Sequence, residues 1–368
     1  MFKEVVKASK DDHTLRENLA TQPLVKHRVF NNPEVLTEGW YPIVASHELK
    51  AGQAKSFLIF KQRIVVFRGE DDSVRVLDAF CPHMGADLGN GRVINNEIQC
   101  YFHQWRFCGK GQLTTVPCQS ELPKGVQTKS YPVEEKFGFI WVYSGPEAPY
   151  SVPHPPGFAS SSQHLSATHL KEAVLYAHHH VMMANGIDLQ HFSAVHNLDV
   201  EFDFEVEDTN GHVFEWNLEG EIPNTGLKNR FLRWLLGPKV GYQARFAGGS
   251  IVTLTYGPNQ RFRGTGFKIP ALHILWGCVP QLNGISHVHI FIVTKRTAGL
   301  WGLIKSKAFT LLTIALLVAL RDDDIKAFPH MRFNPKHLIK ADKSVARFIQ
   351  LTDKLRLSAW SGPNQDME

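Results

Sequence analysis

The fold is decided by the stretch Cys81–His103, CPHMGADLGNGRVINNEIQCYFH. It contains two short pairs, Cys81-x-His83 and Cys100-x-x-His103, which are separated by sixteen residues. Each pair combines one thiol with one imidazole, and both groups are common metal ligands. The stretch therefore predicts two loops that converge on one metal centre with two sulfur and two nitrogen ligands.

This ligand set matches a Rieske [2Fe–2S] cluster, in which two Cys hold one iron and two His hold the other. Imidazole in place of thiolate raises the reduction potential to about −150 to +300 mV, against about −400 mV for all-Cys plant-type clusters. Structural zinc is the alternative, although zinc sites usually pair Cys with Cys and His with His. The sequence thus favours a [2Fe–2S] cluster held by Cys81, His83, Cys100 and His103.

The chain has 368 residues, of which 43% are hydrophobic and 11% aromatic, and a net charge of +5. Such a length and composition predict two or three domains with a sizeable core. The charge is spread along the chain without a basic stripe, so no nucleic-acid partner is expected. The cysteines outside the predicted cluster are scattered and the N-terminal residues form no apolar signal segment, which favours a cytoplasmic location.

Short β-type runs with Gly, Asp and Ser turns between them extend from Trp40 to Tyr143 and predict an antiparallel β domain. A Pro-rich segment at 144–158 marks a boundary. The part that follows mixes strands and helices, so the expected fold class is α+β, a curved antiparallel sheet gripped by helices after an N-terminal antiparallel β domain. The expected strands are 212–222, 242–256, 271–280 and 286–296, and the expected helices are 299–328 and 335–357.

A second group of potential ligands lies in NGIDLQHFSAVHN, which contains Asp188, His191 and His196. His191 and His196 can reach one metal if the helix bends or ends between them, and Asp188 shares a helical face with His191. Two His and one carboxylate form the facial triad of non-haem Fe(II) oxygenases. A His pair alone is weak evidence, but an electron-delivering cluster in the same chain requires an acceptor.

The missing carboxylate is expected in the run Asp322, Asp323, Asp324. Acids at the C-terminal end of a helix are unfavourable unless a cation compensates them, and a metal ion would do so. Spacing alone does not choose among the three.

The apolar segment 308–320 precedes this acidic run. It is shorter than the roughly twenty residues that span a bilayer. The segment predicts a buried helix or a peripheral membrane contact, the latter helped by Lys305 and Lys307. The run His178–His180 is predicted to be structural, because neighbouring side chains of a strand point to opposite faces.

These motifs, together with HQWRF (103–107), GKGQLTTVP (109–117), KSYPVEEKFGFIWV (129–142) and DDDIKAF (322–328), resemble Rieske non-haem iron oxygenases. The resemblance covers roughly 38–355. Within the superfamily the chain is most similar to the branch of 3-ketosteroid 9α-hydroxylase oxygenase components and cholesterol 7-desaturases. The implied domains are an arm at 1–37, a Rieske domain at 38–148 and a helix-grip catalytic domain at 149–368.

The resemblance implies that His191, His196 and Asp322 hold Fe(2+), and that Asp188 bridges the iron-site His to the cluster of a neighbouring subunit in a homotrimer. It also implies a terminal oxygenase component, which uses O2 and electrons from NAD(P)H through a separate reductase or ferredoxin. The expected reaction is hydroxylation or desaturation of a bulky hydrophobic substrate, first of all a sterol or steroid.

Two positions depart from the branch, because Lys326 stands where Trp is frequent and Tyr101 where Pro is common. Both leave the ligands intact but put the substrate in question. The alternatives are the same iron chemistry on a non-steroid natural product, by oxidative cyclisation or demethylation, and a Rieske electron carrier with an inert C-terminal module.

Overall fold

The computed structural model describes residues 27–158, 165–195, 200–257, 271–295, 299–328, 331 and 333–362. The chain divides into two compact units. The β unit contains Val35–Pro153 and the segment that starts at Arg356, and the α+β unit contains the chain before Val35 and His154–Leu355. The segment from Arg356 was expected in the C-terminal domain, but its backbone pairs with the β unit, where the Glu38 N–H donates to the Arg356 carbonyl at 2.8 Å.

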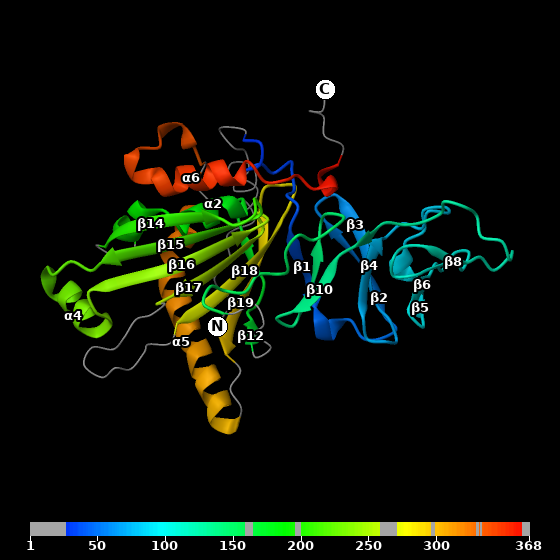
Figure 1. Ribbon diagram of the computed structural model, residues 1–368, viewed down its shortest axis with the longest axis horizontal. Coiled ribbons are helices and arrows are strands. Elements are labelled where there is room, and N and C mark those ends of the chain that lie inside the picture. The colour runs from blue at the N-terminus through cyan, green and yellow to red at the C-terminus, as the bar shows by residue number, and fades with distance from the viewer. Residues whose placement is uncertain are drawn as a thin grey trace, which may run out of the picture. The chain divides into compact units, whose positions relative to one another are not determined.

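Three small antiparallel sheets form the β unit (Figure 1). The first contains β1 (Trp40–Ala45), β11 (Phe139–Tyr143) and β10 (Val133–Lys136) in that spatial order. The second contains β2 (Ala54–Ile59), β3 (Gln62–Arg68), β4 (Val74–Asp78) and β9 (Ser130–Tyr131). The third contains β5 (Arg92–Ile94), β6 (Glu97–Gln99), β7 (Arg106–Phe107) and β8 (Leu113–Thr115).

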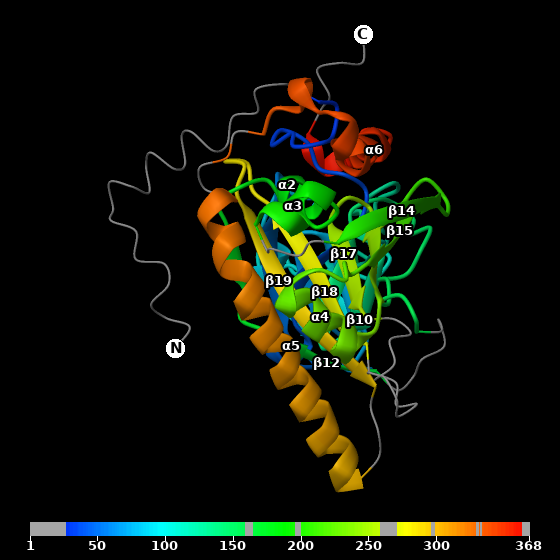
Figure 2. The same cartoon turned by 90° about the vertical axis from the view of Figure 1, so that its left-hand side faces the viewer.

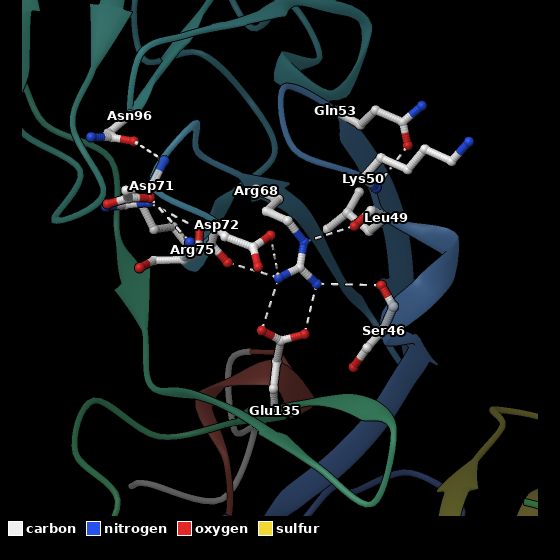
Figure 3. A network of polar contacts seen from close by, with 11 residues as sticks. Ser46, Leu49, Lys50, Gln53, Arg68, Asp71, Asp72, Arg75, Asn96 and Glu135 are labelled. Atoms are coloured by element: carbon white, nitrogen blue, oxygen red, sulfur yellow. Dashed lines mark hydrogen bonds and ion pairs between the residues drawn. The ribbon is translucent and has the colours of Figure 1, made fainter.

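The buried guanidinium of Arg68 joins the first two sheets of the β unit (Figure 3). It donates two parallel hydrogen bonds to the Glu135 carboxylate, at 2.6 and 2.9 Å. It also donates to the Leu49 carbonyl at 2.7 Å and to the Asp72 carbonyl at 2.8 Å. Only the planar fork of Arg supplies so many donors in fixed directions, so one side chain ties β3 to β10 and to two loops.

One large antiparallel sheet forms the framework of the α+β unit. Its spatial order is β12 (Leu165–His169), β19 (Ser286–Lys295), β18 (Leu272–Pro280), β17 (Ile251–Tyr256), β16 (Lys239–Ala247), β15 (Val213–Glu221) and β14 (Glu201–Asp208). A short additional strand, β13 (Ala173–Leu175), also pairs with β19. The alternation of apolar and polar residues along β15 buries one face of that strand and leaves the other partly solvated.

The run 242–256, expected as one strand, is a hairpin of β16 and β17. Gly248 and Gly249 connect the two strands with φ angles of 57° and 71°. Two successive left-handed residues are what a tight hairpin turn requires, and glycine adopts them without strain. The interpretation as one strand was wrong because the Gly-Gly turn signal was not weighed.

Five helices accompany the sheet within the described ranges (Figure 2). They are α2 (His179–Asn185), α3 (Leu189–Ala194), α4 (Gly226–Leu236), α5 (Gly299–Ala327) and α6 (Lys343–Thr352). The core on one sheet face packs β15, β16 and β17 against α2 and α6. The expected helix 299–328 is therefore confirmed, whereas 335–357 contains only the shorter α6 and two 3-10 turns.

The predicted fold class is confirmed: an antiparallel β unit is followed by a large antiparallel sheet with helices. No helix in the described part of the chain is both long enough and apolar enough to cross a membrane.

Candidate functional site

The two predicted cluster loops adopt the same hydrogen-bonded turn. In the first, the Cys81 N–H donates to the Ala86 carbonyl at 2.8 Å, and the Gly85 N–H donates back to the Cys81 carbonyl at 2.8 Å. In the second, the Cys100 N–H donates to the Trp105 carbonyl at 2.8 Å, and the Gln104 N–H donates back to the Cys100 carbonyl at 3.0 Å.

The fourth residue after each Cys is left-handed, with φ of 77° at Gly85 and 60° at Gln104. Such a residue closes a tight turn. The loops that follow β4 and β6 thus share one backbone conformation, and each contains one Cys and one His.

The imidazoles of the two turns lie next to each other. The ring centroids of His83 and His103 are 4.6 Å apart. Trp105 lies flat on His83, with centroids 4.1 Å apart and planes inclined by 7°. Both His were predicted from their spacing, whereas Trp105 was not singled out, although it lies in the motif HQWRF beside His103.

The two Cys lie in the core of the β unit, where Cys81 is 3% and Cys100 2% exposed. Burial raises the pKa of the Cys81 thiol to about 11, and the Cys100 thiol beside it adds to the effect. Backbone N–H groups of His83 and Met84 act in the opposite direction. Donors aimed at the sulfur favour the thiolate that a metal ion requires, so the donor set and its surroundings fit a cluster with two Cys and two His ligands.

Asp87 fixes the first loop to the sheet below it. Its carboxylate accepts from Ser56 Oγ at 2.5 Å, from Arg63 Nε at 2.6 Å and from the Gly89 N–H at 2.8 Å. Burial raises the pKa of Asp87, but the hydrogen bonds from Ser56 and Arg63 outweigh it, so the pKa is lowered overall. The loop is therefore held by an ionised carboxylate, a role that the sequence analysis did not assign.

In the α+β unit, Asp188 and His191 lie at the start of α3. Asp188 is the N-cap, and its carboxylate accepts from the N–H groups of Gln190 at 3.0 Å and His191 at 3.3 Å. The side-chain amide nitrogen of Asn185 lies 3.1 Å from Nε2 of His191. With the amide nitrogen as donor, Nε2 accepts this hydrogen bond through its lone pair, which is the same lone pair that a metal ion would use.

The structure describes the other expected iron ligands only in part. His196 lies outside the described residues. Asp322 and Asp323 lie within α5, and their side chains are outside the described part of the structure. Phe328, which follows the acidic run, is buried against Ala177 and Val181 at the start of α2. The chain just after Asp322 therefore returns to the helix that precedes α3.

The three neighbouring imidazoles of His178–His180 are all buried, with nitrogens within 4.8 Å of one another. They begin α2 and do not lie in a strand, so the reason given for their structural role was wrong. His178 Nδ1 accepts from the His180 N–H at 3.2 Å. Nε2 of His179 and of His180 lie 2.8 and 3.1 Å from the Gly249 carbonyl, to which both can only donate. These bonds engage one nitrogen of each ring and support a structural role.

An open hollow of about 1420 Å³ lies over β14, β15 and β16. Carboxylates are prominent in its lining, among them Glu201, Asp203, Glu205, Glu219 and Glu221. Such a polar surface does not suit a hydrophobic substrate.

A family model for the Rieske [2Fe-2S] domain matches residues 39–132. "Cholesterol 7-desaturase nvd" of Drosophila melanogaster is 34% identical over 174 residues, which are 46% of this chain and 40% of that protein. "Probable 3-ketosteroid-9-alpha-monooxygenase, oxygenase component" of Rhodococcus rhodochrous is 32% identical over 177 residues, which are 45% of this chain and 42% of that protein. The chain thus spans less than half the length of these relatives.

The fold of most of the chain is similar to that of solved structures. "Pseudomonas putida CBB5 NdmB" superposes with a TM-score of 0.61 at 15% identity, over 90% of this chain and 93% of the other. Dicamba monooxygenase bound to dicamba superposes with a TM-score of 0.56 at 18% identity, over 86% of this chain and 96% of the other. A related dicamba monooxygenase structure contains non-haem iron. The chain thus contains a Rieske [2Fe-2S] domain at residues 39–132, and its two-unit fold is similar to that of these solved structures.

Proposed function

We propose that the chain is a terminal oxygenase component that hydroxylates or desaturates a bulky, sterol-like substrate with O2. The observation that carries the proposal is the pair of similar turns in which His83 and His103 lie side by side and both Cys are buried. In addition, the second unit positions His191 near the start of α3. A cluster site alone would suit an electron carrier, and the second potential metal site favours an oxygenase.

Cys81 and Cys100 would hold one iron of the cluster, and His83 and His103 the other. The bound cluster supplies one electron at a time at a potential that hydrogen bonds to sulfur adjust. The role of this chain's own residues is to aim N–H groups at Cys81, to cover His83 with Trp105 and to hold the loop through Asp87.

His191, His196 and Asp322 would hold the mononuclear iron, which activates O2 when bound. The contact of Phe328 with α2 supports the assignment of the acidic run, since it returns the end of α5 toward α3. Asp188 holds the N-terminal end of α3 and so sets the direction of His191, which is compatible with a bridging role toward a neighbouring subunit in a trimer.

The sterol-like substrate is supported by the names of the two curated relatives, one a cholesterol desaturase and the other a 3-ketosteroid monooxygenase component. Lys326 and Tyr101, which depart from the pattern of that branch, keep a non-steroid natural product as the second candidate. Electrons would come from a separate reductase or ferredoxin, as the word "component" implies for the Rhodococcus protein.

The test is mass spectrometry of products from the iron-loaded chain with a surrogate reductase, NADH and a panel of sterols and steroids. A product heavier by one oxygen indicates hydroxylation, and one lighter by two hydrogens indicates desaturation. Iron content separates the oxygenase from the carrier, since about three irons per chain are expected for the first and about two for the second. An iron content of two in the wild type, unchanged in His191→Ala, contradicts the proposal.

A further inference from the structure

Two helices of the α+β unit carry large apolar side chains on their solvent faces. In α5, Trp301 is 82%, Leu311 66% and Leu312 55% exposed, and Ile304 is exposed as well. In α4, Leu227 is 87% and Trp234 59% exposed. Monomeric proteins seldom leave so many large apolar side chains in water, and such groups mark interaction surfaces.

The spacing in α5 places these side chains in one stripe. Trp301, Ile304, Leu311 and Leu312 follow three- and four-residue steps that keep side chains on one helix face, and Leu303, which is 53% exposed, lies outside this stripe. Gly302 and Thr313, on the opposite face, are buried. The apolar stripe is therefore not a core surface left open by chance, because the same helix has a separate buried face.

The second helix repeats this pattern. Leu227, Phe231 and Trp234 lie four and three residues apart on one exposed face of α4. The rings of Phe231 and Trp234 stack, with centroids 5.9 Å apart. Figure 1 shows α4 and the N-terminal half of α5 on the side of the unit away from α6, and Figure 2 shows α5 running past the ends of the strands.

The charged residues of α4 and of α5 up to Leu320 are all basic. Lys305 and Lys307 are exposed at the two borders of the stripe in α5, and Arg230 is exposed beside the stripe in α4. Neither α4 nor α5 up to Leu320 contains an acidic residue. Two copies of this chain that met through the same stripes would bring cations against cations, whereas an anionic lipid surface complements the basic residues of both helices.

We infer that the apolar stripes of α4 and of the N-terminal half of α5 bind the surface of an anionic lipid bilayer. Apolar and aromatic side chains that enter the headgroup region beside Lys and Arg are typical of helices that lie in a membrane interface. The surface begins at Trp301 and includes α4, so it extends beyond the segment 308–320 indicated by hydropathy. Bilayer contact would bring the chain to a reservoir of sterol-like molecules, but the binding itself needs neither reductase nor substrate.

The test is flotation of the full iron-loaded chain with vesicles of phosphatidylcholine alone or with phosphatidylserine. We expect the chain to float with the anionic vesicles and to be released by salt. The variants Leu311→Gln/Leu312→Gln and Lys305→Glu/Lys307→Glu should each lower the vesicle-bound fraction by roughly tenfold. The matched control is Leu282→Gln, an exposed apolar residue of the β18–β19 turn, which should float like the wild type.

The visible spectrum of the cluster and light scattering are measured on every variant, so that misfolding and altered assembly are recognised. Because flotation does not require turnover, an inactive enzyme that floats supports the membrane surface and contradicts only the proposed activity. A wild type that stays with the protein fraction overturns the inference. The inference is also overturned if a variant of the α5 stripe changes the mass of the oligomer but not the vesicle-bound fraction, because the stripes would then be an interface between copies.

Discussion

Trp105 lies parallel to His83, with the two ring centroids 4.1 Å apart. The Trp105 carbonyl also accepts the N–H of Cys100. One residue of the second loop therefore covers the His of the first loop while it closes its own turn around a Cys. This relationship joins the two loops at the point where the cluster is expected.

Replacement of Trp105 by Leu should raise the reduction potential of the cluster by some tens of millivolts, because water that reaches His83 favours the more negative, reduced form. Trp105→Phe keeps an aromatic ring on His83 and should shift the potential less. Redox titration followed by EPR measures both. Equal potentials in the two variants and the wild type would show that the stacked ring has no influence on the cluster.

Arg68→Lys should destabilise the β unit by about 2 kcal/mol, since the buried guanidinium loses hydrogen bonds whose acceptors the lysine cannot all reach. The lysine keeps the charge but cannot make the paired hydrogen bonds to Glu135 and the bonds to Leu49 and Asp72. Arg75→Lys, which changes a more exposed Arg–Asp pair, is the control and should cost less than about 1 kcal/mol. Cluster bleaching in urea is the measurement, and equal midpoints for the two variants would contradict the expectation.

The buried His179 predicts a loss of stability in weak acid. Burial lowers its pKa to about 4, although its hydrogen bond to Gly249 acts in the opposite direction. His179 takes up a proton near pH 6.5 in the unfolded chain but only near pH 4 in the folded chain. Its contribution to the free energy of unfolding is therefore complete above pH 6.5 and is lost as the pH falls toward 4. His179→Gln should flatten the decline of the melting temperature between pH 7 and pH 5. The exposed His47→Gln should leave it unchanged, and an equally steep decline in His179→Gln would exclude this origin.

Asp188 caps the N-terminal end of α3, and this structural role can be separated by experiment from its proposed role in electron transfer. Asp188→Ala removes the N-cap of α3 and should cost about 1 kcal/mol of helix stability, with loss of mononuclear iron as His191 loses its direction. Asp188→Asn keeps a capping oxygen, so it should retain about three irons per chain and yet slow oxidation of the reduced cluster in a single turnover. Iron analysis with stopped-flow absorbance distinguishes the two effects. A wild-type rate in Asp188→Asn would leave Asp188 as a cap alone.

The sequence by itself determined the parts of this protein that depend on local spacing. Cys81, His83, Cys100 and His103 could be predicted as cluster ligands because a cluster needs two short ligand pairs, and the α+β class followed from the order of strand and helix patterns. The tertiary structure alone decided what depends on contacts between distant segments. Three long-range contacts are specified by no local pattern: Trp105 on His83, Asp87 with Ser56 and Arg63, and the return of Arg356 to the β unit.

Hydropathy detected an apolar segment at 308–320. Only packing against the sheet decides which face of α5 is buried and which apolar side chains, from Trp301 onward, remain in water.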